Sequence, residues 1–135
     1  MSNKKTENVI LTNMCMIHDG NRILVQDRKK KDWPGITLPG GHVEIGELFI
    51  ESVIREIYEE TGLIIKSPKL VGIKEWSFDG IRYIALLYKT NEYSGKIKPS
   101  KEGEIFWINL DEIDKYKLAG SLKSILEIYF ENDLK

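Results

Sequence analysis

Cysteine is nearly absent from this chain, since Cys15 is the only one among 135 residues. One cysteine can form neither an internal disulfide nor an all-cysteine metal site, and the two histidines, His18 and His42, lack the spacing of a zinc motif. The sequence therefore excludes a disulfide scaffold and a zinc module. We interpret Cys15 as a small buried hydrophobic residue in a strand, in a protein of the reducing cytoplasm.

Long apolar runs and an excess of one charge are also missing. No run approaches the ~20 apolar residues that span a membrane. The basic residues at the start precede an apolar stretch that Thr12 and Asn13 interrupt, so we predict no signal peptide and no contact with a membrane. The formal net charge is −1, from 20 Lys and Arg against 21 Asp and Glu. Binding to DNA or RNA needs a basic face, so we expect no nucleic-acid polymer as partner.

What the chain does contain is a regular series of strand-like segments. Apolar and aromatic stretches predict strands at 8–17, 22–28, 69–78, 81–93 and 103–110. The first is too apolar for a strand with one wet face, so we predict that it is covered on both faces. Asp19-Gly20 predicts a hairpin turn after it. We expect one domain, residues 1–135, of the α/β class with a sheet packed between helices.

Loops and helices are predicted between these strands. Gly and Pro make 29–41 a loop, and polar residues make 93–103 another. The acidic stretch after the first loop is predicted to be a helix that ends near Gly62. A short helix begins at Asp111 with acids in its first turn. The final segment places five apolar residues on one helical face: Leu118, Leu122, Ile125, Leu126 and Tyr129.

The acidic stretch carries an unusual concentration of one charge. Six glutamates and a single strong base, Arg55, lie between Glu44 and Glu60. On a helix, Glu56, Glu59 and Glu60 share one arc beside a core-facing arc that holds Ile50, Val53, Ile54, Ile57 and Thr61. Like charges at these spacings destabilise a helix by about a few tenths of a kcal/mol per pair. A bound divalent cation removes this conflict, and a solvated acidic face is the alternative.

A glycine-rich loop, LPGG at 38–41, leads into this helix, and glycine lets a backbone come close to a ligand. Such a loop before clustered carboxylates suits a metal-bound polyphosphate. The whole stretch resembles the Nudix box, G-x5-E-x7-R-E-U-x-E-E-x-G-U, in which U is a bulky aliphatic residue. All nine fixed positions of residues 41–63 are filled: Gly41, Glu47, Arg55, Glu56, Ile57, Glu59, Glu60, Gly62 and Leu63.

The resemblance implies a fold and a chemistry. Nudix proteins share an α/β/α sandwich with a mixed β-sheet and hydrolyse a nucleoside diphosphate linked to another group, with Mg²⁺ or Mn²⁺. Gly40 and Gly41 are expected to contact the substrate, and Arg55 to orient a box glutamate by pairing with Glu47. The resemblance assigns the metal ligands and leaves two of them as alternatives for the general base: the ligands are the Gly40 carbonyl, Glu56, Glu59 and Glu60, and the base is Glu56 or Glu59.

Two residues outside the box resemble positions of mutator-type Nudix members. Those members supply an acid from a loop after the sheet, and Glu102 in "SKEGEIFW" matches as a ligand or base, with Glu104 as the neighbouring alternative. Arg28 stands where they bind phosphate. The alternatives are a solvated loop acid and a solvated basic turn. Three aromatic residues are predicted mainly to pack in the core, with stacking on a base as the alternative: Trp76, Phe78 and Tyr83.

The compact length and the loops resemble most closely the mutator-type nucleoside triphosphate pyrophosphohydrolases. These clear oxidised nucleotides such as 8-oxo-dGTP and release a nucleoside monophosphate and pyrophosphate. Their purine-reading asparagine precedes the last helix, where this chain has residues 118–121, and Ser121 is interpreted as a helix N-cap. Hydrolysis of ADP-ribose or a dinucleoside polyphosphate, and a non-catalytic nucleotide sensor, are the alternatives. We expect a small-molecule nucleotide as partner and a monomer or homodimer.

Overall fold

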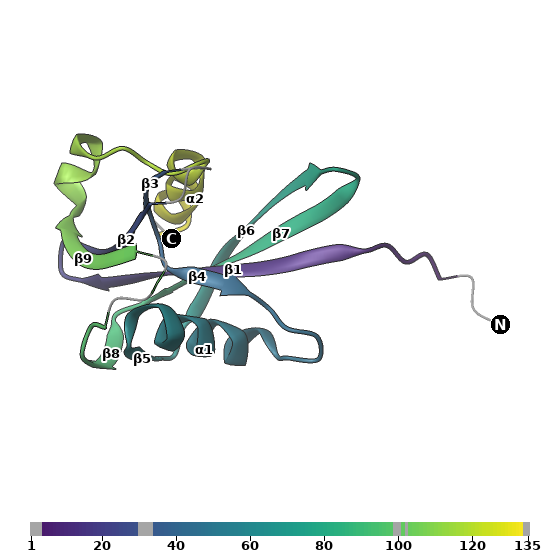
Figure 1. Cartoon of the computed structure of the whole chain (residues 1–135), viewed down its shortest axis with the longest axis horizontal. Helices are drawn as coiled ribbons and strands as arrows, with labels where there is room; N and C mark the ends of the chain where they lie inside the picture. Colours follow the sequence, from purple (N-terminus) through teal and green to yellow (C-terminus); the bar gives the residue numbers. More distant parts are fainter. Residues whose placement is uncertain (1–3, 30–33, 99–100, 102, 134–135) are drawn as a thin grey trace.

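The centre of the molecule is a mixed sheet with a helix on each face (Figure 1). The computed structural model describes residues 4–29, 34–98, 101 and 103–133. Among these residues, seven strands form the large sheet: β1 (Val9–Asp19), β2 (Arg22–Arg28), β3 (Gly35–Thr37), β4 (Gly40–His42), β6 (Lys69–Phe78), β7 (Ile81–Thr90) and β9 (Gly103–Asn109). The strand order is β3-β2-β1-β7-β6, with β4 paired to β1 and β9 paired to β2. Only the β1–β7 pair, among the described pairs of this sheet, is parallel.

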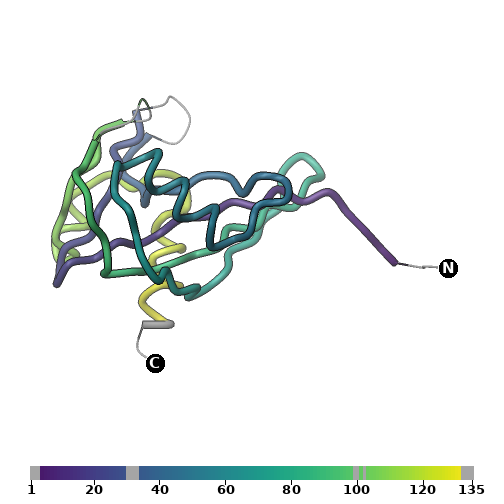
Figure 2. Tube along the Cα trace, turned by 90° about the horizontal axis from the view of Figure 1, so that it is seen from below, coloured from purple at the N-terminus to yellow at the C-terminus, as the bar shows by residue number. Residues whose placement is uncertain are grey.

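Two helices cover the sheet and a smaller sheet lies beside it. The helices are α1 (Phe49–Thr61) and α2 (Leu122–Asp133), with a short 3₁₀ helix, η1 (Leu110–Lys115), between β9 and α2; the small sheet pairs β5 (Leu63–Lys66) with β8 (Glu92–Gly95). Figure 2, seen from the α1 side, shows α1 across the front of the strands and α2 behind them. The predicted α/β/α arrangement with a mixed sheet is therefore confirmed. No described helix is both long enough and apolar enough to cross a membrane.

Side chains alternate along the central strands, so each strand contributes to both cores. Cys15 and Ile17 of β1 belong to the core under α1, whereas Met16 belongs to the core under α2. All three are almost fully buried, which confirms that the first predicted strand is covered on both faces. The Cys15 side chain packs in the core, as predicted. Burial raises the pKa of its thiol, which makes the thiol unreactive.

Two predicted loops contain short strands that the sequence did not reveal. Loop 29–41 holds β3 and the start of β4, and the segment after Thr90 holds β8, which pairs with β5. Strands of three or four residues are too short to show an alternating pattern, and partners distant in sequence give no local signal. Predicted strand 81–93 is divided at Thr90, whose hydroxyl donates to Lys66 O over 2.6 Å and accepts from Glu92 N–H over 3.1 Å.

All three predicted helices are present, with corrections at their ends, and the short one predicted from Asp111 is the 3₁₀ helix η1, which begins at Leu110. Gly62 ends α1 as predicted, in the left-handed region at φ 83°, and its N–H donates to Tyr58 O. Ile50 was placed on the core-facing arc but is 45% exposed, because the first turn of α1 precedes the part that packs on the sheet. Leu118 was placed in the last helix but lies before α2, in an isolated bridge with Ile36.

Candidate active site

The candidate site lies where the short strand β4 passes between β1 and α1. A side chain at Gly40 would collide with the backbone of Asn13 and Met14, and one at Gly41 would overlap the carboxylate of Glu56. Glycine at both positions lets the strand contact the sheet and the helix at once. The box loop is therefore held directly against the helix that carries the clustered glutamates.

Glu56 is fixed at this contact and largely enclosed. Its side chain is 13% exposed, with Arg55 Nη1 3.6 Å from Oε1. The backbone N–H of His42 donates to Oε2 over 2.8 Å. Burial raises the pKa of the Glu56 carboxyl, while the His42 N–H and the Arg55 charge oppose that rise. The carboxyl consequently holds a proton more tightly than an exposed glutamate does.

Glu60 lies one helical turn after Glu56 and lines the same cavity. The side-chain amide of Gln26, on β2, donates to Glu60 Oε2 over 2.9 Å. Because the donor is a neutral amide, this contact orients the carboxylate without neutralising its charge. Glu56, Glu60 and Gly40 all line one cavity of about 570 Å³. Two carboxylates from α1 and the β4 backbone thus meet in a single space.

Arg55 and Glu47 form the strongest ion pair of the loop. Arg55 Nε lies 2.6 Å from Glu47 Oε2, and Nη2 lies 2.9 Å from Oε1, so the pair is bidentate. Glu44 N–H also donates to Glu47, and Arg55 Nη2 donates to His42 O over 3.0 Å. The hydrogen bonds from Arg55 and then Glu44 lower the pKa of Glu47 to about 2. The predicted contact between Arg55 and Glu47 is present, and it ties the loop to α1.

Glu59 is placed differently from the other two clustered glutamates. Its side chain is 54% exposed, and it accepts a hydrogen bond from Arg55 Nη1 over 3.1 Å. It does not line the cavity that Glu56 and Glu60 share. In the described part of the chain, no three His, Cys, Asp or Glu side chains are arranged around one metal position. The structure brings together three of the four predicted ligands: Gly40, Glu56 and Glu60.

The chemistry of these three groups fits a hard divalent cation. Carboxylate and carbonyl oxygens are the ligands that Mg²⁺ prefers, and Mg²⁺ commonly uses one or two protein carboxylates together with water and substrate phosphates. Glu56 and Glu60 supply two carboxylates, and glycine at position 41 leaves room for the Glu56 carboxylate beside β4. The donor set therefore suits Mg²⁺ or Mn²⁺ and lacks the thiolate and imidazole ligands of a zinc site.

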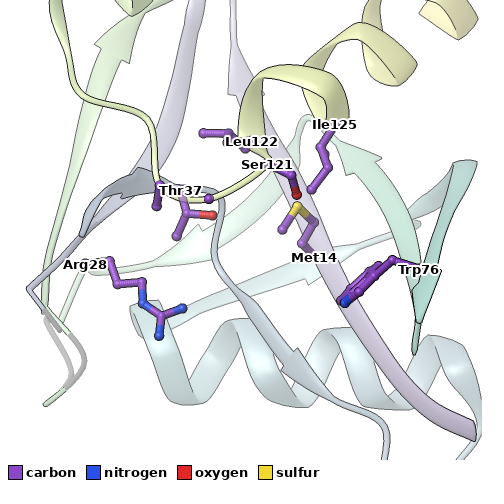
Figure 3. Close-up of a pocket in the computed structure, with 9 residues that line it drawn as sticks. Met14, Arg28, Thr37, Trp76, Ser121, Leu122 and Ile125 are labelled. Atoms are coloured by element: carbon purple, nitrogen blue, oxygen red, sulfur yellow. The ribbon is translucent and has the colours of Figure 1, made fainter. Parts of the chain in front are cut away.

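A second cavity of about 410 Å³ shares four lining residues with the first, and its walls are mainly apolar (Figure 3). Figure 3 shows Arg28 and Trp76 on opposite sides of it, with Met14 between them. Residues that line both cavities are Met14, Arg28, Thr37 and Trp76. The far wall is the segment just before α2 together with the first turn of α2: Ala119, Gly120, Ser121, Leu122 and Ile125. A carboxylate-bearing cavity and an aromatic-edged cavity are thus joined through Arg28 and Thr37.

The prediction that Trp76 and Phe78 pack in the core is wrong. They are 42% and 68% exposed, because both lie on β6, the edge strand of the sheet. Trp76 stacks on its strand partner Tyr83 with a centroid separation of 5.4 Å and an interplanar angle of 10°. Apolar composition alone does not distinguish an edge strand from a central one. Trp76 therefore presents a supported aromatic face to both cavities.

Some of the remaining predicted residues line the cavities, and the others do not. Arg28 lines both cavities, and Ser121 directly precedes α2 and lines the apolar one. Glu102 lies outside the described residues. Its neighbour Glu104, on β9, is 69% exposed in its side chain, lies 3.3 Å from Lys29 Nζ and lines neither cavity.

Asn13 and Gln26 are residues that sequence reasoning missed. Both line the carboxylate cavity and are nearly buried, at 4% and 7% exposure. A signal was present, because Asn13 interrupts an apolar strand and Gln26 directly follows three apolar residues of β2, where an unbonded amide would be costly. The sequence could not name their partners, which come from β4 and α1.

Comparison with known proteins gives the same family as the box and the fold. Residues 10–127 match the model of the NUDIX domain. An ADP-ribose pyrophosphatase of Methanocaldococcus jannaschii is 38% identical over 120 residues, which cover 84% of this chain and 69% of that protein. The crystal structure of the mutator MutT protein of Bacillus halodurans superposes with a TM-score of 0.77 at 30% identity, covering 88% of this chain and 80% of that one. A MutT NUDIX hydrolase of Burkholderia pseudomallei gives a TM-score of 0.79 at 25% identity, with 90% and 98% covered.

The fold, the box and these comparisons together define a hydrolase. The chain belongs to the Nudix family. Nudix hydrolases act on small-molecule nucleotide substrates and generally use divalent metal ions. The mutator-like appearance of the sequence agrees with the MutT structures to which the fold is similar.

Proposed function

We propose that this chain hydrolyses a nucleoside triphosphate to a nucleoside monophosphate and pyrophosphate, with Mg²⁺ or Mn²⁺. The observation that carries this proposal is the junction of the two cavities. The carboxylate cavity suits metal-bound phosphates, and the apolar cavity with its Trp76 edge suits a base. Together they have the size and the mixed lining of a small-molecule site.

We assign different residues of this chain to metal binding, phosphate binding and proton transfer. Glu56, Glu60 and the Gly40 carbonyl would hold the metal, with Glu59 joining them on release from Arg55. A bound metal ion would supply charge neutralisation of the phosphates and activation of water. We assign phosphate binding to Arg28, which lines both cavities. We assign the general base to Glu56 or Glu59, and the pH profiles of their glutamine variants distinguish the two.

The other proposed roles concern the loop and the acid outside the described residues. Arg55 orients Glu47 and holds the β4 loop through His42 O, so Gly40 and Gly41 stay beside the substrate phosphates. Glu102 is proposed as an additional ligand or base.

The apolar cavity bears on base selectivity. Its described polar side chains are Arg28, Thr37 and Ser121, together with the indole of Trp76. An amide side chain can bond a purine edge through an N–H donor and an oxygen acceptor at the same time. The hydroxyls of Thr37 and Ser121 do not have this arrangement. Stacking and apolar contact therefore dominate base binding in our proposal. An oxidised purine nucleotide such as 8-oxo-dGTP remains the first substrate to test.

The test is a nucleotide panel with Mg²⁺ in ¹⁸O-labelled water. We expect a triphosphate to give a monophosphate and pyrophosphate in equal amounts, with the label in only one of them. Label in the monophosphate places the attack on the α-phosphorus, and label in pyrophosphate places it on the β-phosphorus. Release of inorganic phosphate alone would contradict the proposed cleavage.

ADP-ribose is the second candidate substrate, because the archaeal relative at 38% identity is named an ADP-ribose pyrophosphatase. The same panel should therefore contain ADP-ribose and a dinucleoside polyphosphate. Faster turnover of either one than of every triphosphate, compared by kcat/KM, would reject the triphosphate assignment. The chain would then be a Nudix hydrolase of that other substrate class.

Trp76→Ala should raise KM at least about fivefold and leave kcat nearly unchanged, because base stacking contributes roughly 1–3 kcal/mol per base. Trp76→Phe should restore most of the affinity. Phe78→Ala is the matched control, since Phe78 lies on the same strand, is more exposed and lines neither cavity. An equal rise in KM for the two alanine variants would show that Trp76 does not contact the base.

A further inference from the structure

Asn13 connects three elements of the candidate site through one buried amide. Its Oδ1 accepts from the backbone N–H of Gly41 over 3.1 Å, and its Nδ2 donates to Ser52 Oγ over 2.9 Å. Ser52 is fully buried and donates in turn to Phe49 O over 2.8 Å. The side chain therefore links β1, β4 and the first turns of α1.

This amide adds a side-chain hydrogen bond to the backbone ladder between β1 and β4. On either side of it the backbones bond directly, from Cys15 N–H to Pro39 O and from Val43 N–H to Leu11 O. Between these bonds, Asn13 and Gly41 are strand partners, and the Gly41 N–H also donates to the Asn13 side chain. An apolar residue would fill the same volume without the cost of burying an amide. The position of a buried amide at this point thus has a specific structural effect on the Gly40–Gly41 peptide.

The effect follows from the planarity of that peptide. The carbonyl of Gly40 and the N–H of Gly41 belong to one trans peptide unit and point in opposite directions. Fixing the N–H toward Asn13 therefore fixes the direction of the carbonyl. Gly40 lines the same cavity as Glu56 and Glu60. We infer that Asn13 is a positioning residue, which sets the Gly40 carbonyl as a metal-binding oxygen in register with the carboxylates of α1.

Ser52 connects the Asn13 amide to α1 by a hydrogen bond. It lies one helical turn before Glu56, so the same network that orients the loop also positions the helical segment that carries the proposed ligands. The next loop N–H, that of His42, bonds directly to Glu56. Side chains thus accept hydrogen bonds from two successive N–H groups of β4, one side chain from the sheet and one from the helix. This inference rests on the proposed function, because it concerns the same metal site.

The test measures Mn²⁺ affinity by EPR without nucleotide, and Gly41 amide exchange by NMR without metal. Asn13→Leu keeps the volume but removes both bonds, so Mn²⁺ should bind at least about tenfold more weakly. Its kcat should fall with little change in KM. The Gly41 amide should exchange more slowly in the wild type than in Asn13→Leu, because the ladder pairing is present in both and only the wild type has the side-chain bond. Ser52→Ala, which keeps the Gly41 bond, should weaken Mn²⁺ binding only a few-fold.

Thr90→Val is the matched control, because Thr90 is also buried and also joins neighbouring segments by one donated and one accepted bond, away from the site. It should lose stability and keep wild-type Mn²⁺ affinity. Mn²⁺ affinity of Asn13→Leu within about twofold of wild type would overturn the inference. If that variant does not fold, an unprotected Gly41 amide in the wild type would overturn it. A wild type that binds Mn²⁺ with a protected Gly41 amide but cleaves no nucleotide would contradict the proposed function alone.

Discussion

Glu56→Gln should lower kcat at least about 10²-fold with little change in KM, because it removes a charge that acts in the transition state. The side chain stays the same size, so the His42 N–H can still bond to the amide oxygen and the fold should survive. Steady-state kinetics on the best substrate of the panel gives this comparison. Activity within a few-fold of wild type would remove Glu56 from the catalytic assignment.

Thermal melts of the same variant separate a metal site from a solvated acidic face. The raised pKa of Glu56 means that the folded state binds its proton more tightly than the unfolded state, so this group lowers stability as pH rises. In EDTA at mildly alkaline pH, Glu56→Gln should be at least as stable as wild type, and the difference should shrink as pH falls toward the usual value of 4.5. Mg²⁺ should then favour the wild type, by about 1.4 kcal/mol at ten times Kd. An equal response of both proteins, reproduced by NaCl at matched ionic strength, would identify a solvated face.

Gly41→Ala should abolish most activity while the protein stays folded. The new methyl group would occupy the position of the Glu56 carboxylate, which ends a flexible side chain and can swing away. We expect kcat to fall at least about 10²-fold, because the displaced carboxylate leaves the His42 N–H and the shared cavity. Circular dichroism and a thermal melt should show a change in stability of no more than about 1 kcal/mol.

Gly20→Ala is the control for this substitution. Gly20 has a positive φ of 61° and open space around the missing side chain, so alanine there introduces backbone strain without a collision. It should cost stability and retain activity, which is the reverse of the pattern for Gly41. If Gly41→Ala keeps wild-type kcat, Glu56 works from a position other than the one in this structure.

The box predicted which residues lie close together, because they belong to one helix and one loop. Arg55 and Glu47 meet as expected, since the loop returns along the same helix face. The position of Glu59 was not predictable, because one guanidinium has several nearby acceptors and geometry decides which it holds. Trp76 was misplaced for a different reason: whether a strand is central or at the edge depends on sheet order, which the sequence pattern does not contain.

The two cavities are built from different parts of the chain. The carboxylates of the first cavity come from α1, whereas the apolar wall of the second comes from residues 119–125 and the edge strand β6. Among the described residues, the two cavities share only Met14, Arg28, Thr37 and Trp76. If the apolar cavity binds the base, as we propose, mutation at residues 119–125 alters which nucleotides are accepted and leaves Glu56 and Glu60 in place. In that arrangement, natural variants or a designed library confined to this short segment would change the preferred base and keep the same hydrolytic reaction.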